Sequence, residues 1–286
     1  MLNLYDDRFT MMKANHNNGV VLIKYGGNAM LDDDVTRELL NEVSGLTKEG
    51  YHVVLVHGGG PFIEDNLKLA GIETEFIEGH RKTTGEAMKY IEMALKGHVN
   101  SKLVRLLNEL GLKAVGLSGK DGKMVQVDKR YHTDQAGNQV DIGFVGNIRN
   151  IDTSLLELLL TNNFIPVVST ISAGEDGADY NVNADMFAGY LAGALKAKHF
   201  IMLTDVDGLL KDPSEPSSLI RELKITEMEE LYQDVIKGGM IPKTEACKKA
   251  IENGAESALI INGKKPERLM ESIRETKNIQ GTRFVK

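Results

Sequence analysis

The stretch Val20-Val21-Leu22-Ile23-Lys24-Tyr25-Gly26-Gly27-Asn28 joins a short apolar run to a lysine and a pair of glycines. A continuous run of β-branched and other apolar residues is typical of a strand that is covered on both faces. The same pattern recurs along the chain, at residues 53–56, 114–117, 164–168, 200–203 and 258–261. Segments of helical period separate these runs. The sequence therefore predicts an α/β fold, a three-layer α/β/α sandwich with an open, mainly parallel central sheet.

Helical periodicity predicts the helices of the outer layers at residues 34–48, 61–69, 85–110, 154–161, 184–197, 226–234 and 243–252. Residues 119–150 break the alternation, because they are rich in Gly, Asp, Asn and Gln. They predict β-hairpins that project from the main sheet. We expect a surface loop at 213–218. We also expect a single domain over residues 1–286 with two lobes, at about 19–165 and about 166–286.

The composition limits the classes of function. The 286-residue chain has a formal net charge of −7 and no Lys/Arg-rich run, which disfavours binding to nucleic acid. No apolar run approaches the ~18 residues that a membrane span needs. Residues 1–18 do not resemble a signal peptide, and the single cysteine, Cys247, allows no intrachain disulfide. We therefore expect a cytoplasmic protein that binds neither nucleic acid nor membranes.

Ligands of parallel sheets bind at the carboxyl ends of the strands, so the residues after the apolar runs are the informative ones. After the first run, Gly26-Gly27 permits a tight turn with exposed N–H groups. Lys24 indicates a negatively charged ligand or, equally, an ordinary turn with a surface lysine. After the second run, His57-Gly58-Gly59-Gly60-Pro61 leads into a helix whose first position suits proline. A glycine loop at a helix N-terminus favours an anion site.

Three later clusters place polar residues at strand ends or helix starts, at 181–185 (Asn-Val-Asn-Ala-Asp), 204–208 (Thr-Asp-Val-Asp-Gly) and 238–244 (Gly-Gly-Met-Ile-Pro-Lys-Thr). Asn183 suits a helix N-cap and Asp185 suits the first turn, which is by itself a sufficient structural reason for both. Asp205 and Asp207 suit ribose hydroxyls or magnesium, and equally a simple turn. Pro242 stands where a Walker A loop needs glycine, so the third cluster is not a P-loop.

Taken together, these clusters resemble the amino-acid kinase family over nearly the whole chain. The resemblance depends on an ordered set of motifs, at residues 24–27, 57–61, 79–84 (Gly-His-Arg-Lys-Thr-Thr), 116–122 (Gly-Leu-Ser-Gly-Lys-Asp-Gly), 181–185, 204–208 and 238–243. It implies the amino-acid kinase fold and transfer of the γ-phosphoryl group of ATP to the side-chain carboxylate of N-acetyl-L-glutamate. That reaction is the second step of arginine biosynthesis and yields an acyl phosphate.

The resemblance also implies roles for particular residues. Lys24 and Lys243 would stabilise the transferring phosphoryl group, and Asp185 would hydrogen-bond both lysines. The backbone N–H groups of Gly27 and Gly59 would donate to phosphoryl oxygens. A glutamate carboxylate, with a solution pKa of about 4.3, is already ionised at neutral pH, so the reaction needs no general base.

The remaining implied contacts concern the two substrates. Gly59 and Gly60 would border the acetylglutamate pocket, where Arg81 and Asn181 would bind the α-carboxylate. Magnesium would bridge the ATP phosphates, and no protein ligand for it is identified. The nucleotide would be held by Asp205, Val206, Asp207, Gly208, Leu209, Leu210, Ile236, Lys237, Gly238 and Gly239.

Two alternatives stay open at this stage. A sibling kinase would act on another carboxylate, such as an aminoadipate or glutamate derivative, free or joined to a carrier protein. The acidic segment 73–78 disfavours an acidic carrier. A non-catalytic metabolite sensor is the other alternative, although Lys24, Lys243 and Asp185 are all present.

The resemblance further implies a homodimer with weak or no inhibition by arginine. Arginine-inhibited hexamers of the family carry an extra N-terminal helix. Residues 15–19 (Asn-His-Asn-Asn-Gly) are poor helix formers, so a hexamer is the less favoured expectation.

Overall fold

The computed structural model describes residues 18–77, 80–134, 136–232, 234–274 and 279–286. The expectation that residues 1–18 lack an oligomerising helix therefore concerns a segment that lies almost entirely outside the described residues. Glu78, in the acidic segment 73–78, and Gly79, in the motif 79–84, also lie outside the described residues.

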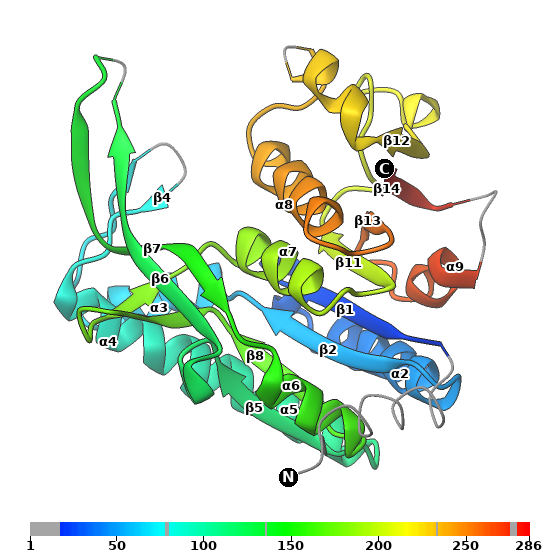
Figure 1. Ribbon diagram of the computed structural model, residues 1–286, viewed down its shortest axis with the longest axis horizontal. Helices are drawn as coiled ribbons and strands as arrows, with labels where there is room; N and C mark the ends of the chain where they lie inside the picture. The colour runs from blue at the N-terminus through cyan, green and yellow to red at the C-terminus, as the bar shows by residue number, and fades with distance from the viewer. Residues whose placement is uncertain (1–17, 78–79, 135, 233, 275–278) are drawn as a thin grey trace, which may run out of the picture.

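An eight-stranded sheet forms the middle layer (Figure 1). Every pair of neighbouring strands in it is parallel except the β13–β14 pair, so the expected mainly parallel sheet is confirmed. All six apolar runs of the sequence are strands of this sheet. In spatial order the strands are β12 (Glu222–Lys224), β14 (Gly281–Val285), β13 (Ala258–Asn262), β11 (His199–Thr204), β1 (Val20–Tyr25), β2 (His52–His57), β8 (Ile165–Ser169) and β5 (Ala114–Ser118).

Helices cover both faces of this sheet, and the two cores follow the period-two alternation of the strands. Leu22 of β1 packs in the core beneath one helix layer, whereas Val21 and Ile23 pack in the core beneath the other. One layer consists of α6 (Ser154–Thr161), α7 (Ala184–Ala194) and α8 (Met240–Glu252). The other consists of α2 (Asp33–Lys48), α5 (Ser101–Glu109) and α9 (Arg268–Arg274).

A second β structure stands beside the main sheet. Strands β6 (Val125–Thr133) and β7 (Gln139–Ile151) form a long hairpin that projects well beyond the layers in Figure 1. With β9 (Ile171–Gly174) and β10 (Asp179–Asn181) they close into a small barrel. The projecting hairpin predicted within 119–150 is thus confirmed.

The predicted helix at 85–110 is built from three parts. Helix α4 (Gly85–Glu92) is followed by a π-helical segment, η2 (Met93–Asn100), before α5 begins. Together with α3 (Gly60–Leu69), α4 and η2 enclose a third, smaller core. This core lies beside the loop that follows β2.

Other expectations about helices were wrong in type or extent. Residues 225–231 form a 3₁₀ segment, η5 (Ile225–Leu231), instead of an α-helix, and α7 ends at Ala194, three residues earlier than expected. Helix α9 was not predicted. Among the described residues, no helix combines the length and the apolar character that crossing a membrane requires.

Candidate active site

The loops that follow the strands at the carboxyl edge of the sheet line two neighbouring cavities. The first, here called the arginine cavity, has a volume of about 250 Å³ and is lined by all four residues expected to bind acetylglutamate: Gly59, Gly60, Arg81 and Asn181. The second, here called the lysine cavity, has a volume of about 200 Å³, and its lining includes Lys24, Gly27, Asp205 and Lys243. The two cavities adjoin at their glycines. A Cβ placed on Gly26, which lines the lysine cavity, would lie 3.7 Å from the backbone nitrogen of Gly58, which lines the arginine cavity.

A buried carboxylate joins the two lysines of the lysine cavity. The ammonium group of Lys24, on β1, lies 2.7 Å from Oδ1 of Asp185. The ammonium group of Lys243, in the first turns of α8, lies 2.9 Å from Oδ2 of the same residue. The predicted contact of Asp185 with both lysines is therefore present, and it ties three elements together.

The first turn of α7 holds Asp185 in place. The side chain of Asn183 accepts hydrogen bonds from the backbone N–H groups of Asp185 and Met186, at 3.0 and 3.1 Å, which confirms Asn183 as the N-cap. A carboxylate in the first helical turn is also stabilised by the helix dipole. Local sequence and helix electrostatics thus point Asp185 toward the lysines.

This cluster of charges is largely removed from water. The side chains of Lys24 and Asp185 are each 8% exposed, and that of Lys243 is 19% exposed. Burial by itself would raise the pKa of Asp185, but the nearby ammonium groups of Lys24 and Lys243 outweigh burial and lower the pKa to about 2. Two cations and one anion leave these three side chains with a net positive charge, which suits an anionic ligand.

Glycines shape the backbone between the two cavities. Gly27 has φ of 76°, in the left-handed region that favours glycine. A Cβ on Gly26 would lie 3.0 Å from Nζ of Lys24, so the absence of a side chain there leaves room for the ammonium group. The N–H of Gly58 donates to the carbonyl of Tyr25 at 3.1 Å, which ties the second glycine loop to the first.

The N-termini of helices α3 and α7 face these glycine loops. Helix α3 starts at Gly60 with Pro61 in its first turn, as predicted. A Cβ on Gly58 would meet the Cβ of Ala184 at 3.2 Å, so the second glycine loop packs against the start of α7. Because the N-termini of helices present unpaired N–H groups, both helices favour negative charge at this edge.

Arg81 reaches the arginine cavity from β4 (His80–Arg81), which pairs with β3 (Phe76–Ile77). Its guanidinium donates to Glu64 at 2.8 Å and lies 4.5 Å from the centre of the Phe76 ring. The hydrogen bond from Arg81 also holds the pKa of Glu64 below its ordinary value. Glu64, on α3, was not singled out from the sequence, and it orients Arg81 while leaving guanidinium N–H groups available for a ligand.

The residues expected to bind nucleotide occupy different environments. Asp205 lines the lysine cavity. Ile236 is fully buried in the core, and Gly238 and Gly239 directly precede α8. The carboxylate of Asp207 points elsewhere, because it accepts hydrogen bonds from Asn262, Lys265 and Arg268 at 2.7 to 3.1 Å.

Several lining residues were missed by the sequence analysis. Thr170 lies directly after β8, so a consistent search of strand ends would have found it. Phe76 and Leu95 also line the arginine cavity, but nothing in their local sequence distinguishes them. In the described part of the chain, no group of three or more His, Cys, Asp or Glu side chains is arranged to hold a metal ion.

Comparisons with known proteins identify the family of the chain. A model of the amino acid kinase family matches residues 19–262. Acetylglutamate kinase from Heliobacterium modesticaldum is 43% identical over 271 residues, which cover 93% of this chain and 92% of that protein. Acetylglutamate kinase from Methanobrevibacter smithii is 42% identical over 272 residues and covers 93% of each chain.

A solved structure supports the fold. N-acetylglutamate synthase from Neisseria gonorrhoeae, crystallised with coenzyme A and N-acetylglutamate, superposes with a TM-score of 0.78 and covers 99% of this chain and 63% of that one. At 20% identity this likeness concerns the fold alone. The family model and the relatives show that the chain belongs to the amino acid kinase family, as its motifs predicted.

The low pKa of Asp185 predicts a dependence of stability on pH. Since the pKa is lowered from 3.8 to about 2 on folding, the ionised carboxylate stabilises the folded state above about pH 4, and this contribution is lost as the pH falls toward 2. The free energy of unfolding, measured by urea denaturation, should therefore fall more steeply between pH 4 and 2 in the wild type than in Asp185→Asn. The exposed-site variant Glu256→Gln is the control, and equal slopes in wild type and Asp185→Asn would contradict the assignment.

Proposed function

We propose that this protein transfers the γ-phosphoryl group of ATP to the side-chain carboxylate of N-acetyl-L-glutamate. The observation that carries the proposal is the buried Lys24–Asp185–Lys243 cluster, which lies where a cavity rich in cations and glycine N–H groups adjoins a cavity that contains Arg81. The names and the high identity of the relatives support the same substrate.

The reaction brings a carboxylate into line with a polyanionic phosphate, so its main difficulty is electrostatic repulsion. Lys24, on β1, and Lys243, on α8, would neutralise charge on the transferring phosphoryl group from two elements. Asp185 holds one ammonium group with each of its oxygens, so neither lysine has to be reoriented when the substrates bind. The N–H groups of Gly27 and Gly59 add two backbone donors.

Features of the arginine cavity fit an acylated amino acid. Arg81 and Asn181 would hold the α-carboxylate, and Glu64 and Phe76 keep the guanidinium in one orientation. The apolar side chains of Ile63 and Leu95 also line this cavity. An acetyl group is better matched to such a lining than the charged ammonium of free glutamate.

The nucleotide would enter from the other lobe. We propose that residues 166–286 bind MgATP through the segments 205–210 and 236–239, and that residues 19–165 bind acetylglutamate. Magnesium would come with the ATP phosphates and keep most of its waters, as is usual for this ion. We place the reaction in the cytoplasm, where ATP is available.

The test of this proposal is acyl-phosphate formation, trapped as a hydroxamate, with MgATP and N-acetylglutamate. Glutamate, aspartate and aminoadipate are the parallel acceptors. We expect product with N-acetylglutamate and little with the others. Product with another acid in its place would move the substrate to a sibling kinase, and folded protein without any product would favour a metabolite sensor.

Removal of either lysine should affect the chemical step. Lys24→Ala or Lys243→Ala is expected to lower kcat on the order of 10²–10³-fold, by analogy with the loss of one donor that stabilises a developing anion. Lys248→Ala is the matched control, since Lys248 also lies on α8 but pairs with Glu229. Near wild-type kcat in both cavity variants would rule out the proposed role.

Arg81→Lys should weaken the binding of acetylglutamate. A lysine keeps the positive charge but not the planar pair of donors that matches a carboxylate, so we expect KM for acetylglutamate to rise about 10–100-fold with little change in KM for ATP. Lys82→Ala, at the neighbouring exposed position, should leave both values unchanged. An unchanged KM in Arg81→Lys would place the α-carboxylate elsewhere.

We further propose a homodimer with weak or no inhibition by arginine, on the resemblance of the chain to uninhibited members of the family. Light scattering coupled to size-exclusion chromatography should give about twice the chain mass of 31.5 kDa. A mass six times that of the chain, or inhibition by low concentrations of arginine in the hydroxamate assay, would contradict this part of the proposal.

A further inference from the structure

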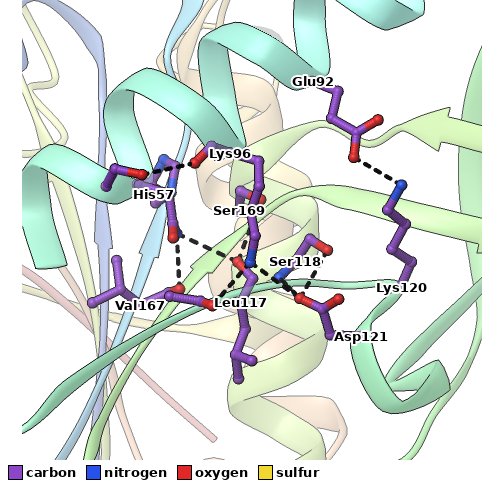
Figure 2. A network of polar contacts seen from close by, with 12 residues as sticks. His57, Glu92, Lys96, Leu117, Ser118, Lys120, Asp121, Val167 and Ser169 are labelled. Carbon is purple, nitrogen blue, oxygen red and sulfur yellow. Dashed lines mark hydrogen bonds and ion pairs between the residues drawn. The ribbon is translucent and has the colours of Figure 1, made fainter.

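A fully buried histidine precedes the second glycine loop. His57 is the last residue of β2 and is 0% exposed. One ring nitrogen, Nδ1, lies 2.9 Å from the carbonyl oxygen of Gly58, and the other, Nε2, lies 2.9 Å from the side-chain nitrogen of Asn100. Figure 2 shows His57 within a polar network that extends to Val167, Leu117 and Ser118. Neither His57 nor Asn100 has a role in the reaction described so far.

The neighbours of Asn100 determine which nitrogen of His57 carries the proton. The side-chain nitrogen of Asn100 donates to the carbonyl of Val167 at 2.9 Å, and this carbonyl can only accept. The same nitrogen lies 2.9 Å from Nε2 of His57 and 3.4 Å from the carbonyl oxygen of Leu117, so the shorter contact takes the second hydrogen and Nε2 accepts it. The Gly58 carbonyl, 2.9 Å from Nδ1, can likewise only accept, so in a neutral imidazole the proton is on Nδ1, which donates to this carbonyl.

This hydrogen bond sets the direction of the next N–H group. In a planar trans peptide, the C=O of one residue and the N–H of the following residue point in opposite directions. With the Gly58 carbonyl held toward the buried ring of His57, the N–H of Gly59 points away from the core. The described residues provide no acceptor for it, and Gly59 lines the arginine cavity.

The π-helical segment η2 supplies a second support for the same loop. Asn100 contacts His57, and Leu95 lies so close to Gly59 that a Cβ there would meet its Cδ2 at 2.8 Å. Residues five apart are about 140° apart around an α-helix of 3.6 residues per turn, but a π-helix closes its hydrogen bond at that spacing and brings them to nearly the same side. The π-helix thus lets one surface contact both His57 and Gly59.

We propose that His57, held by Asn100, is a positioning residue that fixes the N–H of Gly59 in the direction needed to donate to the transferring phosphoryl group. This inference rests on the phosphoryl-contacting role proposed for Gly59. The loop itself has no side chains from Gly58 to Gly60 that could hold it, so its orientation depends on the groups around it. His57 does not exchange a proton with the substrates, because both ring nitrogens are engaged away from the cavity.

The neutral state that this arrangement needs is stable at physiological pH. Burial lowers the pKa of His57 to about 4, the hydrogen bond to the Gly58 carbonyl opposes this shift, and the charge of Lys96 adds to it. The proton on Nδ1 and the lone pair on Nε2 are therefore maintained at the pH of the assay.

Two substitutions separate the contacts of the ring. The amide nitrogen of His57→Asn can occupy the place of Nδ1 and donate to Gly58, whereas the longer side chain of His57→Gln reaches toward Asn100 and leaves the Gly58 carbonyl without its donor. We expect His57→Gln to lower kcat about 10–100-fold, which does not exceed the decrease expected when a complete hydrogen-bond donor is removed. KM for both substrates should stay within about threefold of the wild-type values. His57→Asn should keep kcat within about fivefold of wild type.

The controls exclude a general effect on folding. His57→Asn and His57→Gln both remove the buried ring, so a role confined to packing would affect the two variants alike. His199→Gln, at the start of β11 on the opposite edge of the sheet, where Nδ1 lies 2.9 Å from the Ser257 hydroxyl, should leave kcat unchanged. Equal kcat in the two His57 variants, or a loss confined to KM, would overturn the inference.

A measurement on the unmodified protein remains decisive where a variant does not fold. Nitrogen chemical shifts of ¹⁵N-labelled histidine should identify His57 as the tautomer with the proton on Nδ1 at pH 7, and the opposite tautomer would overturn the inference. Failure of the proposed function gives a different result, because the wild type would then form no acyl phosphate from N-acetylglutamate. An active wild type with unaffected His57 variants would reject the positioning role alone.

Discussion

The attraction of one buried carboxylate for two ammonium groups is the interaction on which the site depends. Asp185 lies at the start of α7, Lys24 on β1 and Lys243 on α8, so their contacts fix the position of one helix layer over the centre of the sheet. Removing three charges from water is unfavourable, and the attraction offsets only part of this because one cation is in excess. An anionic ligand would supply the missing negative charge, so its binding would also neutralise the excess positive charge of the site.

The parallel sheet explains why so few charged side chains are enough to form an anion site. Because β1, β2, β8 and β11 run in the same direction, the turns that follow them meet at one edge, where two glycine loops and the N-termini of α3 and α7 converge. Backbone N–H groups and helix dipoles there carry partial positive charge without further lysines. This is consistent with a chain that is acidic overall, with a net charge of −7, yet presents a positive cleft.

Much of this arrangement was predictable from the sequence, because it is encoded locally. Each apolar run became a strand, Asn183 caps the helix that carries Asp185, and the glycine loops follow their strands. The parts that were not predicted depend on contacts between distant segments. The π-helical turn within 85–110 has no distinct periodicity, and the pairing of Arg81 with Glu64, or of Asp207 with Arg268, joins residues that only the tertiary structure brings together.

The glycine loops raise a physical question that the surrounding residues answer. Glycines allow the backbone to approach a phosphate closely, but they also lose the most conformational entropy on ordering and have no side chains to restrain them. A loop of three such residues is useful as an anion site only if the groups around it hold its peptide planes. The carbonyl of Tyr25, the imidazole of His57, and the packing of Leu95 and Ala184 provide that support from four separate elements. The rigidity of the site therefore resides in its neighbours, and substitutions that never touch a substrate should be able to alter the chemistry.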